Sequence, residues 1–115
     1  MVREPIERLE EKVLKENLWV FVFRILKEKD EYAYEVRKTI EKRFGFLAGN
    51  VTGYKVLYLL EKDGYVKSYM KGRRNYYKLT EKGLKQLEKA KSFFKKVYTS
   101  IWKRKKELKN STTSC

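Results

Sequence analysis

The residues best suited to bind a polyanion lie between positions 52 and 83. A helix at 52–62 would have an apolar side built from residues at three- and four-residue spacing, Val56, Leu57 and Leu60. Its other side would carry side chains that can donate hydrogen bonds to phosphate, namely Thr52, Tyr54, Lys55 and Tyr58. Thr52 is suited to cap the start of this helix and Gly64 to end it. The stretch therefore predicts a helix with one buried side and one side free to contact a ligand.

A hairpin with a cationic tip follows this helix. Strand-forming residues fill 65–70 and 75–80, and the two runs are joined by Lys71, Gly72, Arg73 and Arg74. A helix followed directly by such a hairpin is typical of the second half of a winged helix-turn-helix. There the helix lies in a major groove of DNA, and the hairpin places its cations on the flanking backbone or in the minor groove. The alternative is an ordinary α+β domain whose exposed hairpin carries solvated charge.

The distribution of charge supports a polyanionic partner. The 115-residue chain carries a formal charge of +14. Residues 1–66 hold 13 Lys or Arg against 12 Asp or Glu, whereas residues 67–115 hold 16 against 3. Such asymmetry favours binding to phosphates, because each phosphate neutralised by a cation releases counterions. Double-stranded DNA is the expected partner, although an acidic membrane surface or an acidic protein would also fit.

Two helical patterns precede the 52–62 helix. Residues 5–17 form a charged helical segment with a proline suited to its first turn, so residues 1–17 are predicted to be an N-terminal helical extension. Residues 18–26 are apolar nearly all round and fit a buried helix or a buried strand; the charged residues that follow favour the helix. Residues 32–44 fit a second helix, ended by Gly45. With the hairpin, this order predicts a mainly α (α+β) winged-helix DNA-binding domain at 18–83.

A long helix is predicted from about 81 to 109, and residues 84–110 are assigned to dimerisation. An apolar residue recurs at every seventh position, which is a coiled-coil pattern. The residues expected at the interface are Leu87, Phe94, Val97, Ile101, Trp102 and Leu108. A helix of this length cannot bury such a stripe alone, so we expect a homodimer; folding back onto the domain's own core is the alternative. Residues 111–115 are expected to be a disordered tail.

Several function classes find no support in the sequence. The chain has no histidine, no glycine-rich phosphate loop, no pair of metal-spaced cysteines and no serine beside an evident base, so catalysis, a metal and a cofactor are not expected. No signal peptide or membrane-spanning stretch is expected, and the single cysteine, Cys115, excludes an internal disulfide framework. We expect an intracellular protein, cytoplasmic and associated with the nucleoid. Abundant Lys and Glu with a single glutamine indicate a hyperthermophilic source.

Three stretches resemble the PadR family of transcriptional regulators: residues 32–36, 52–66 and 72–83. The last, Gly-Arg-Arg-Asn-Tyr-Tyr-Lys-Leu-Thr-Glu-Lys-Gly, is the most specific, although its ending also occurs in other winged-helix families such as the MarR type. The resemblance implies a winged-helix fold that dimerises through its C-terminal helix. It also implies contacts to the DNA backbone by Tyr34, Thr52, Tyr54, Arg73 and Arg74.

The sequence departs from the family's usual pattern at four places. Gly53 replaces a leucine, Lys55 a proline and Ala33 a glycine, and the wing lacks a proline between its two basic residues. Lys55 adds charge where the helix would meet DNA. Gly53 weakens the start of the helix by up to about 1 kcal/mol relative to alanine. These departures bear on which DNA sequence is bound.

Some PadR-like proteins bind planar aromatic ligands between the two subunits, using aromatic side chains from the first and last helices. Trp19 and Trp102 lie in suitable segments, so the resemblance implies a small aromatic effector held by these two residues. The alternative is that both tryptophans simply pack in the core or in the dimer interface, as large aromatic residues commonly do.

These observations together predict a sequence-specific DNA-binding transcriptional regulator. It would be a dimeric repressor that reads a major groove with the 52–62 helix and the backbone with the wing at 67–78, through Lys71, Arg73 and Arg74. The alternatives are a non-specific architectural nucleic-acid-binding protein and a winged-helix adaptor that binds other proteins. Cations on both the helix and the wing favour the first two, because an adaptor needs neither. RNA is less favoured, because single-strand binding usually uses aromatic residues across an open sheet, and the sequence predicts only a hairpin.

Overall fold

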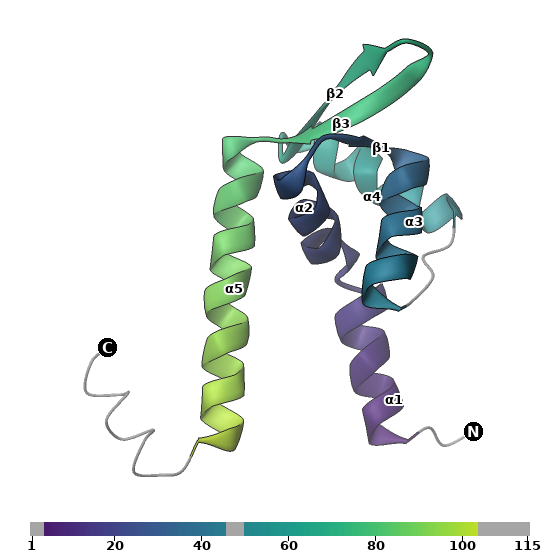
Figure 1. Cartoon of the computed structure of the whole chain (residues 1–115). Helices are drawn as coiled ribbons and strands as arrows, with labels where there is room; N and C mark the ends of the chain where they lie inside the picture. The colour runs from purple at the N-terminus through teal and green to yellow at the C-terminus, as the bar shows by residue number, and fades with distance from the viewer. Residues whose placement is uncertain (1–3, 46–49, 104–115) are drawn as a thin grey trace.

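The chain folds into helices that carry one small sheet (Figure 1). The computed structural model describes residues 4–45 and 50–103, and only the backbone of residues 50–53. In chain order the elements are α1 (Pro5–Glu10), the π-helical segment η1 (Glu11–Lys15), α2 (Leu18–Glu28), β1 (Glu31–Tyr32), α3 (Ala33–Phe44), α4 (Asn50–Lys62), β2 (Val66–Lys71), β3 (Arg74–Leu79) and α5 (Glu81–Trp102). The predicted mainly α class, with helices followed by a hairpin and a long helix, is confirmed.

Helix α2 is the centre of the core. Its sequence is compatible with a helix or a strand, and the structure shows the helix. Its buried side chains are Leu18, Val22, Phe23, Ile25 and Leu26, which helical spacing places on one side. The core is completed by Val36 and Ile40 of α3, Leu57 of α4, Val66 of β2 and Leu87 of α5. Helices α3, α4 and α5 therefore all depend on α2 for their packing.

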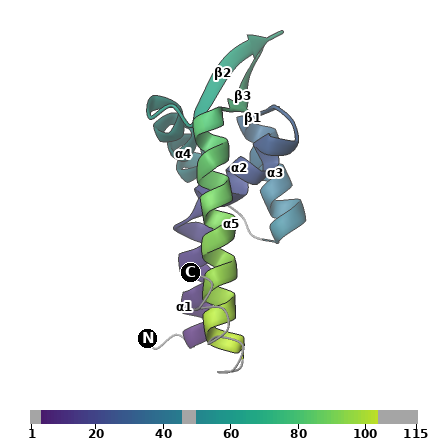
Figure 2. The same cartoon turned by 90° about the vertical axis from the view of Figure 1, so that its left-hand side faces the viewer.

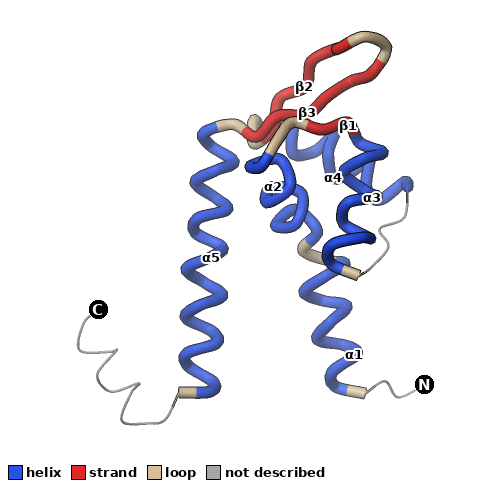
Figure 3. Tube along the Cα trace, viewed as in Figure 1, coloured by secondary structure: helices blue, strands red, loops and turns tan. Residues whose placement is uncertain are grey.

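The sheet has the strand order β1-β3-β2, and both strand pairs are antiparallel. The hairpin matches the prediction, with Val66 paired to Leu79 at its base. Strand β1 is a correction: the sequence predicts a helix from Tyr32, but Tyr32 pairs with Tyr76 of β3 and the helix begins at Ala33. The helices lie on one side of the sheet, as the trace coloured by secondary structure shows (Figure 3).

Left-handed glycines end α3 and α4, as predicted. Gly45 has a φ of 76°, and its N–H donates to the Glu41 carbonyl at 3.1 Å. Gly64 has a φ of 82°, and the N–H of the next residue, Tyr65, donates to the Leu60 carbonyl at 2.9 Å. Glycine adopts this conformation without the steric cost that a β-carbon imposes.

Helix α4 begins earlier than predicted. Its first residue is Asn50, so Thr52 lies within the first turn and the prediction that Thr52 caps the helix is wrong. Most of the predicted loop at 46–51 lies outside the described residues. The predicted N-terminal helical segment is present as α1 and η1, with Pro5 at the first helical position.

The start of α5 is held by hydrogen bonds to the turn that follows α4. Thr80 caps α5, because its hydroxyl accepts a hydrogen bond from the Gly83 N–H at 3.1 Å. The same hydroxyl donates to the Gly64 carbonyl at 2.8 Å. The Lys82 ammonium donates to the Asp63 carbonyl at 2.6 Å. The two ends of the wing are thereby fixed to one another.

Gly83 is required by close packing at this junction. A β-carbon there would collide with the Tyr65 carbonyl oxygen and with the Leu79 side chain. The Leu-Thr-Glu-Lys-Gly motif at 79–83 therefore has a structural explanation: it joins the wing to α5.

Helix α5 is shorter than predicted. It ends at Trp102, because Lys103 has extended backbone angles (φ −75°, ψ 146°), so the predicted helix to about residue 109 is wrong at this point. Leu108 and the predicted tail lie outside the described residues. Helices α1 and α5 both extend away from the sheet in two perpendicular views (Figures 1 and 2). Among the described residues, none of the helices combines the length and apolar character that crossing a membrane requires.

Candidate nucleic-acid interface

Helix α4 presents a polar side to solvent. Leu57 is 2% exposed in the core, whereas Tyr54 and Tyr58 are 53% and 62% exposed. Lys55 is also exposed. The side chain of Thr52, the fourth predicted contact on this helix, lies outside the described residues. Phenol and ammonium donors on an exposed helical side can reach phosphate oxygens and base edges in a major groove.

The C-terminal end of α4 is held against the hairpin. The Ser68 hydroxyl of β2 donates to the Glu61 carboxylate near the end of the helix. The core residues Leu57 and Val66 add apolar packing on either side of the turn. Because both elements are anchored, the exposed side of α4 has a fixed orientation relative to the wing.

The cations at the tip of the wing are not equivalent. Lys71 and Arg74 are paired across the strands, so Gly72 and Arg73 form a two-residue turn. Gly72 has a φ of 64°, and a left-handed glycine at this first position is typical of a type II′ hairpin. Arg73 is exposed and makes no hydrogen bond or ion pair with the described residues. The Lys71 ammonium lies 5.6 Å from the centre of the Tyr76 ring.

Arg74 is tied to the sheet. Its guanidinium donates to the Tyr32 hydroxyl at 2.8 Å and lies 4.5 Å from the centre of the Tyr32 ring. The Tyr32 hydroxyl in turn donates to the Glu35 carboxylate at 3.1 Å. Desolvation and this hydrogen bond raise the pKa of Tyr32 above its ordinary value. The sequence carries no local signal for this cluster, because it depends on the pairing of β1 with β3.

Tyr34 lies in the first turn of α3, directly after β1. It is 50% exposed, and the Lys38 ammonium one turn further on lies 5.4 Å from the centre of its ring. Lys38 was not among the predicted contacts; its four-residue spacing from Tyr34 is the signal that could have indicated it. Helix α3 packs against α4, which carries the other predicted contacts.

A comparison with known protein families identifies the chain. The model of the PadR-like family of transcriptional regulators matches residues 22–89, which include α3, α4, the wing and the start of α5. The chain belongs to the PadR-like family.

Solved structures agree with this assignment. A PadR family transcription regulator from Clostridium difficile R20291 is 34% identical over 72% of this chain and 95% of that chain, with a TM-score of 0.65. A transcriptional regulator from Clostridium thermocellum is 30% identical over 80% of this chain and 99% of that chain, with a TM-score of 0.67. A winged-helix DNA-binding protein from STIV, 24% identical over 70% of this chain and 89% of that chain, shares the fold with a TM-score of 0.63. Comparison with curated proteins gives no match.

In this PadR-like chain the residues predicted for dimerisation divide into two groups. Leu87 is 9% exposed and belongs to the chain's own core, so here α5 folds back onto its own domain. Phe94, Ile101 and Trp102 are 41%, 59% and 65% exposed, and Val97 is half-buried. The heptad pattern is therefore continuous in sequence, but its first residue is buried in the core and its later residues are exposed or half-buried.

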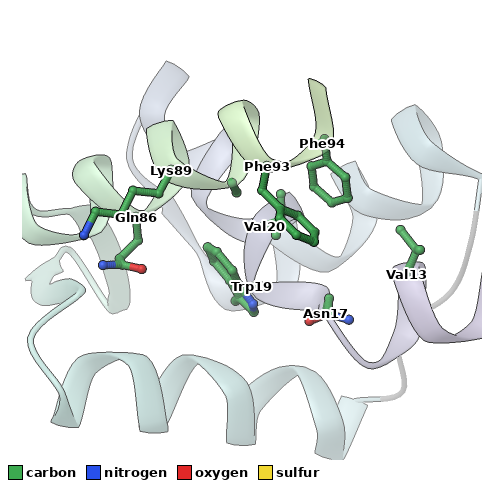
Figure 4. A pocket seen from close by; sticks show the side chains of 9 residues that line it. Val13, Asn17, Trp19, Val20, Gln86, Lys89, Phe93 and Phe94 are labelled. Carbon is green, nitrogen blue, oxygen red and sulfur yellow. The ribbon is translucent and has the colours of Figure 1, made fainter. Parts of the chain in front are cut away.

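A pocket of about 350 Å³ beside Trp19 is the candidate site for a small molecule (Figure 4). It is lined by Val13, Asn17, Trp19, Val20, Gln86, Lys89, Ala90, Phe93 and Phe94. Trp102 is not among them; its ring packs on Tyr98, with 5.2 Å between the ring centres. Within one chain, the two tryptophans predicted to hold an effector are not brought together. In the described part of the chain, no three His, Cys, Asp or Glu side chains are grouped to hold a metal ion.

Proposed function

We propose that this PadR-like chain is a sequence-specific, duplex-DNA-binding regulator that acts as a dimeric repressor. Helix α4 would lie in a major groove, with Thr52, Tyr54, Lys55 and Tyr58 toward the DNA. The observation that carries the proposal is the exposed pair Tyr54 and Tyr58 on a helix that Leu57 anchors in the core. Repression follows where the bound site overlaps a promoter, since occupancy then blocks the polymerase.

The wing is proposed to contact the flanking DNA backbone through residues 67–78. Arg73 is the strongest candidate for direct contact, because it is exposed at the tip and has no partner in the described part of the chain. Lys71 would assist it. Arg74 would act by stiffening the wing, because its guanidinium is already bonded to the Tyr32 hydroxyl.

The dimer is proposed to form through residues 93–102 of α5. This segment exposes Phe93, Phe94, Tyr98, Ile101 and Trp102, each by at least 41%. A large exposed apolar surface is typical of an interaction site, and a second copy of the same chain is its commonest partner. Helix α1 would contribute Ile6 and Leu9, which are 53% and 56% exposed. A two-fold dimer would place its two α4 helices at half-sites about one helical turn apart.

The two alternative functions make different predictions. A non-specific architectural protein would bind any duplex with equal affinity, and that affinity would fall steeply with salt. An adaptor would bind no duplex. Exposed cations on both α4 and the wing favour DNA binding over the adaptor, because protein binding requires neither.

The variants Tyr54→Ala and Arg73→Ala test the assigned surface. Binding would be measured by fluorescence anisotropy with a labelled duplex from the region upstream of the coding sequence. Arg73→Ala should weaken binding to all duplexes alike and reduce the slope of log affinity against log salt by about 1. Tyr54→Ala should weaken binding on the order of tenfold. Lys85→Ala removes an exposed cation from α5 outside this surface and is the matched control. If both variants bind as tightly as the parent, the surface is wrong.

The pocket beside Trp19 is the proposed site for a planar aromatic effector. A ligand there would lie between α2 and α5, where Trp19, Phe93 and Phe94 approach one another. It would change the angle at which α5 leaves the winged-helix domain, and with it the spacing of the two α4 helices. In the Trp102→Phe variant, Trp19 is the only tryptophan, so its fluorescence reports directly on the pocket. Planar aromatic ligands should quench it; unchanged fluorescence with all of them would refute the site.

A further inference from the structure

The face of the sheet that points away from the helices carries a row of aromatic rings. Val66 and Leu79 are paired and belong to the core, so the alternation of strands places Tyr69 and Tyr76 on the opposite face. Tyr32 of β1 pairs with Tyr76 and joins the same row. One tyrosine from each of the three strands therefore lies in a line across the sheet. In Figure 1 this face is the upper one, with the helices below it.

The rings of this row are packed on one another, and Tyr69 is its most open member. Tyr69 and Tyr76 are stacked, with 5.8 Å between ring centres and 19° between ring planes. Tyr32 meets Tyr76 edge-on at 5.5 Å. Tyr69 is 40% exposed. Since one face of its ring is covered by Tyr76, the exposed area is the other face and the ring edge. An exposed ring backed by a second ring is a rigid surface for stacking.

Cations lie on this face on both sides of the aromatic row. Lys67 pairs with Lys78 two residues nearer the base of the hairpin than the paired tyrosines. Lys71 pairs with Arg74 two residues nearer its tip. Because side chains alternate between the two faces along a strand, all four cations lie on the face that carries the tyrosines. Neighbouring rows along the strands are separated by two residues, or about 7 Å.

Two carboxylates also approach the row, and one of them is Glu35, which accepts a hydrogen bond from the Tyr32 hydroxyl. The Tyr69 hydroxyl donates to Asp30 at 2.7 Å. This hydrogen bond holds the ring across the sheet and raises the pKa of Tyr69. The row therefore has four cations around it against two carboxylates, and each carboxylate is hydrogen-bonded to a tyrosine hydroxyl.

We propose that this face binds single-stranded nucleic acid, with an unpaired base stacked on Tyr69 and the neighbouring phosphates on Lys67, Lys78 and Lys71. Aromatic rings across an open sheet, flanked by cations, are the usual means of binding single strands. The unpredicted strand β1 extends the hairpin to three strands and thereby supplies the arrangement that a hairpin alone lacks. An acidic protein is the less favoured occupant, because it would use the cations but not the stacked rings.

This activity is separate from the proposed reading of duplex DNA by α4. Tyr69 lies on the outer face of β2, whereas Tyr54 and Tyr58 lie on a helix beneath the sheet. A regulator with both surfaces could bind an operator through α4 and a nearby unpaired strand, such as a melted promoter or a nascent transcript, through the sheet. The wing cation Lys71 is assigned to both activities, so the two are separated by Tyr54→Ala and Tyr69→Ala, each of which changes a residue named for only one of them.

The test is the affinity of the full chain for labelled oligo(dT) and oligo(U) of about 12 nucleotides, a length within the range that small single-strand-binding folds cover. The variants are Tyr69→Ala, Tyr69→Phe and Met70→Ala. Tyr69→Ala should weaken binding on the order of tenfold, the usual effect of removing one stacked ring. Tyr69→Phe keeps the ring and loses only the hydrogen bond to Asp30, so it should stay within about twofold of the parent.

The control residue is Met70, which is 64% exposed and lies beside Tyr69 on the other face of the strand. Met70→Ala and Tyr54→Ala should both leave single-strand affinity unchanged. A preference between the two oligonucleotides would tell whether DNA or RNA is the natural strand.

The proposal is refuted if neither oligonucleotide binds at low salt, or if Tyr69→Ala binds as tightly as Met70→Ala. Equal losses in Tyr69→Phe and Tyr69→Ala would also refute it, because stacking would not be the cause. Loss of duplex binding in Tyr54→Ala with single-strand binding retained separates this proposal from the previous one.

Discussion

The two halves of α5 lie in opposite environments. In the first half Gly83, Leu87 and Ala90 are buried against the winged-helix domain. In the second half Phe93 and Ile101 are 62% and 59% exposed. Both halves belong to one continuous amphipathic helix. One apolar stripe can therefore complete a chain's own core at one end and remain available to a partner at the other.

The lengths of the helices explain where this change occurs. Helix α5 has 22 residues and α2, the core helix on which it packs, has 11. At a rise of about 1.5 Å per residue, α2 can cover no more than about half of α5. The rest extends past the domain in the same direction as α1, whose Ile6 and Leu9 are also exposed. The uncovered half is the one that we propose to dimerise.

The largest effect is expected from Ile101→Lys in the second half. A lysine at this exposed position should leave the fold of each chain intact, but it would bury an unpaired charge twice in the dimer. Each such charge costs about 3–5 kcal/mol, so the dimer should be lost in sedimentation equilibrium. Duplex affinity should fall although positive charge has been added, which excludes lost electrostatic attraction as the cause. Ser92→Lys, on the other side of the same helix, adds the same charge and should keep the dimer. A dimeric Ile101→Lys variant would contradict the division of α5.

Leu87→Ala should act on the first half in a different way. Leu87 is packed in the core, and truncating a buried leucine costs about 2–5 kcal/mol of unfolding free energy. Urea unfolding should show this loss at every protein concentration. Ile101→Ala is the matched control, since its effect should depend on protein concentration and vanish in dilute solution. If the stability loss depends on protein concentration in the same way in both variants, the two halves of α5 do not have different roles.

Gly83→Ala tests the junction at which α5 begins. The added methyl would meet the Tyr65 carbonyl and the Leu79 side chain, so the helix start must shift. Forced overpacking of this kind costs about 1–3 kcal/mol and should lower the midpoint of urea unfolding. In the same helix Ser92→Ala, at an exposed position, is the control and should be neutral. An unaltered midpoint for Gly83→Ala would mean that the junction adapts freely.

The smallest effect is expected from Glu88→Gln. Glu88 pairs with Lys27 of α2 at 3.5 Å, and both side chains are largely exposed, at 54% and 42%. Exposed pairs of this kind contribute about 0–1 kcal/mol and are screened by salt. The midpoint of urea unfolding should therefore change little. At high salt it should be the same in the variant and in the parent protein. A loss as large as that of Leu87→Ala would show that polar contacts, and not apolar packing, hold the first half of α5.

The sequence predicts what depends on neighbouring residues and misses what depends on distant ones. The amphipathic pattern of α4, the hairpin, and the glycines that end α3 and α4 all follow from local spacing and backbone preference. Strand β1 does not, because its two residues become a strand only by pairing with β3. The same pairing brings Arg74 to Tyr32, so the constraint on this wing cation could not be predicted either. The burial of Leu87 in the chain's own core could not be predicted either, because a heptad pattern does not indicate which helix will cover the residue.

The most direct test of the proposed function is the affinity of the parent protein for its own upstream region against a scrambled duplex of equal length, across a salt series. For both duplexes the logarithm of affinity should fall with the logarithm of salt concentration, with a slope of about −0.9 per phosphate contacted. We predict a preference for the upstream region that persists at physiological salt, with two chains bound per duplex. Equal affinity for both duplexes at every salt concentration, or no binding to either, would contradict it.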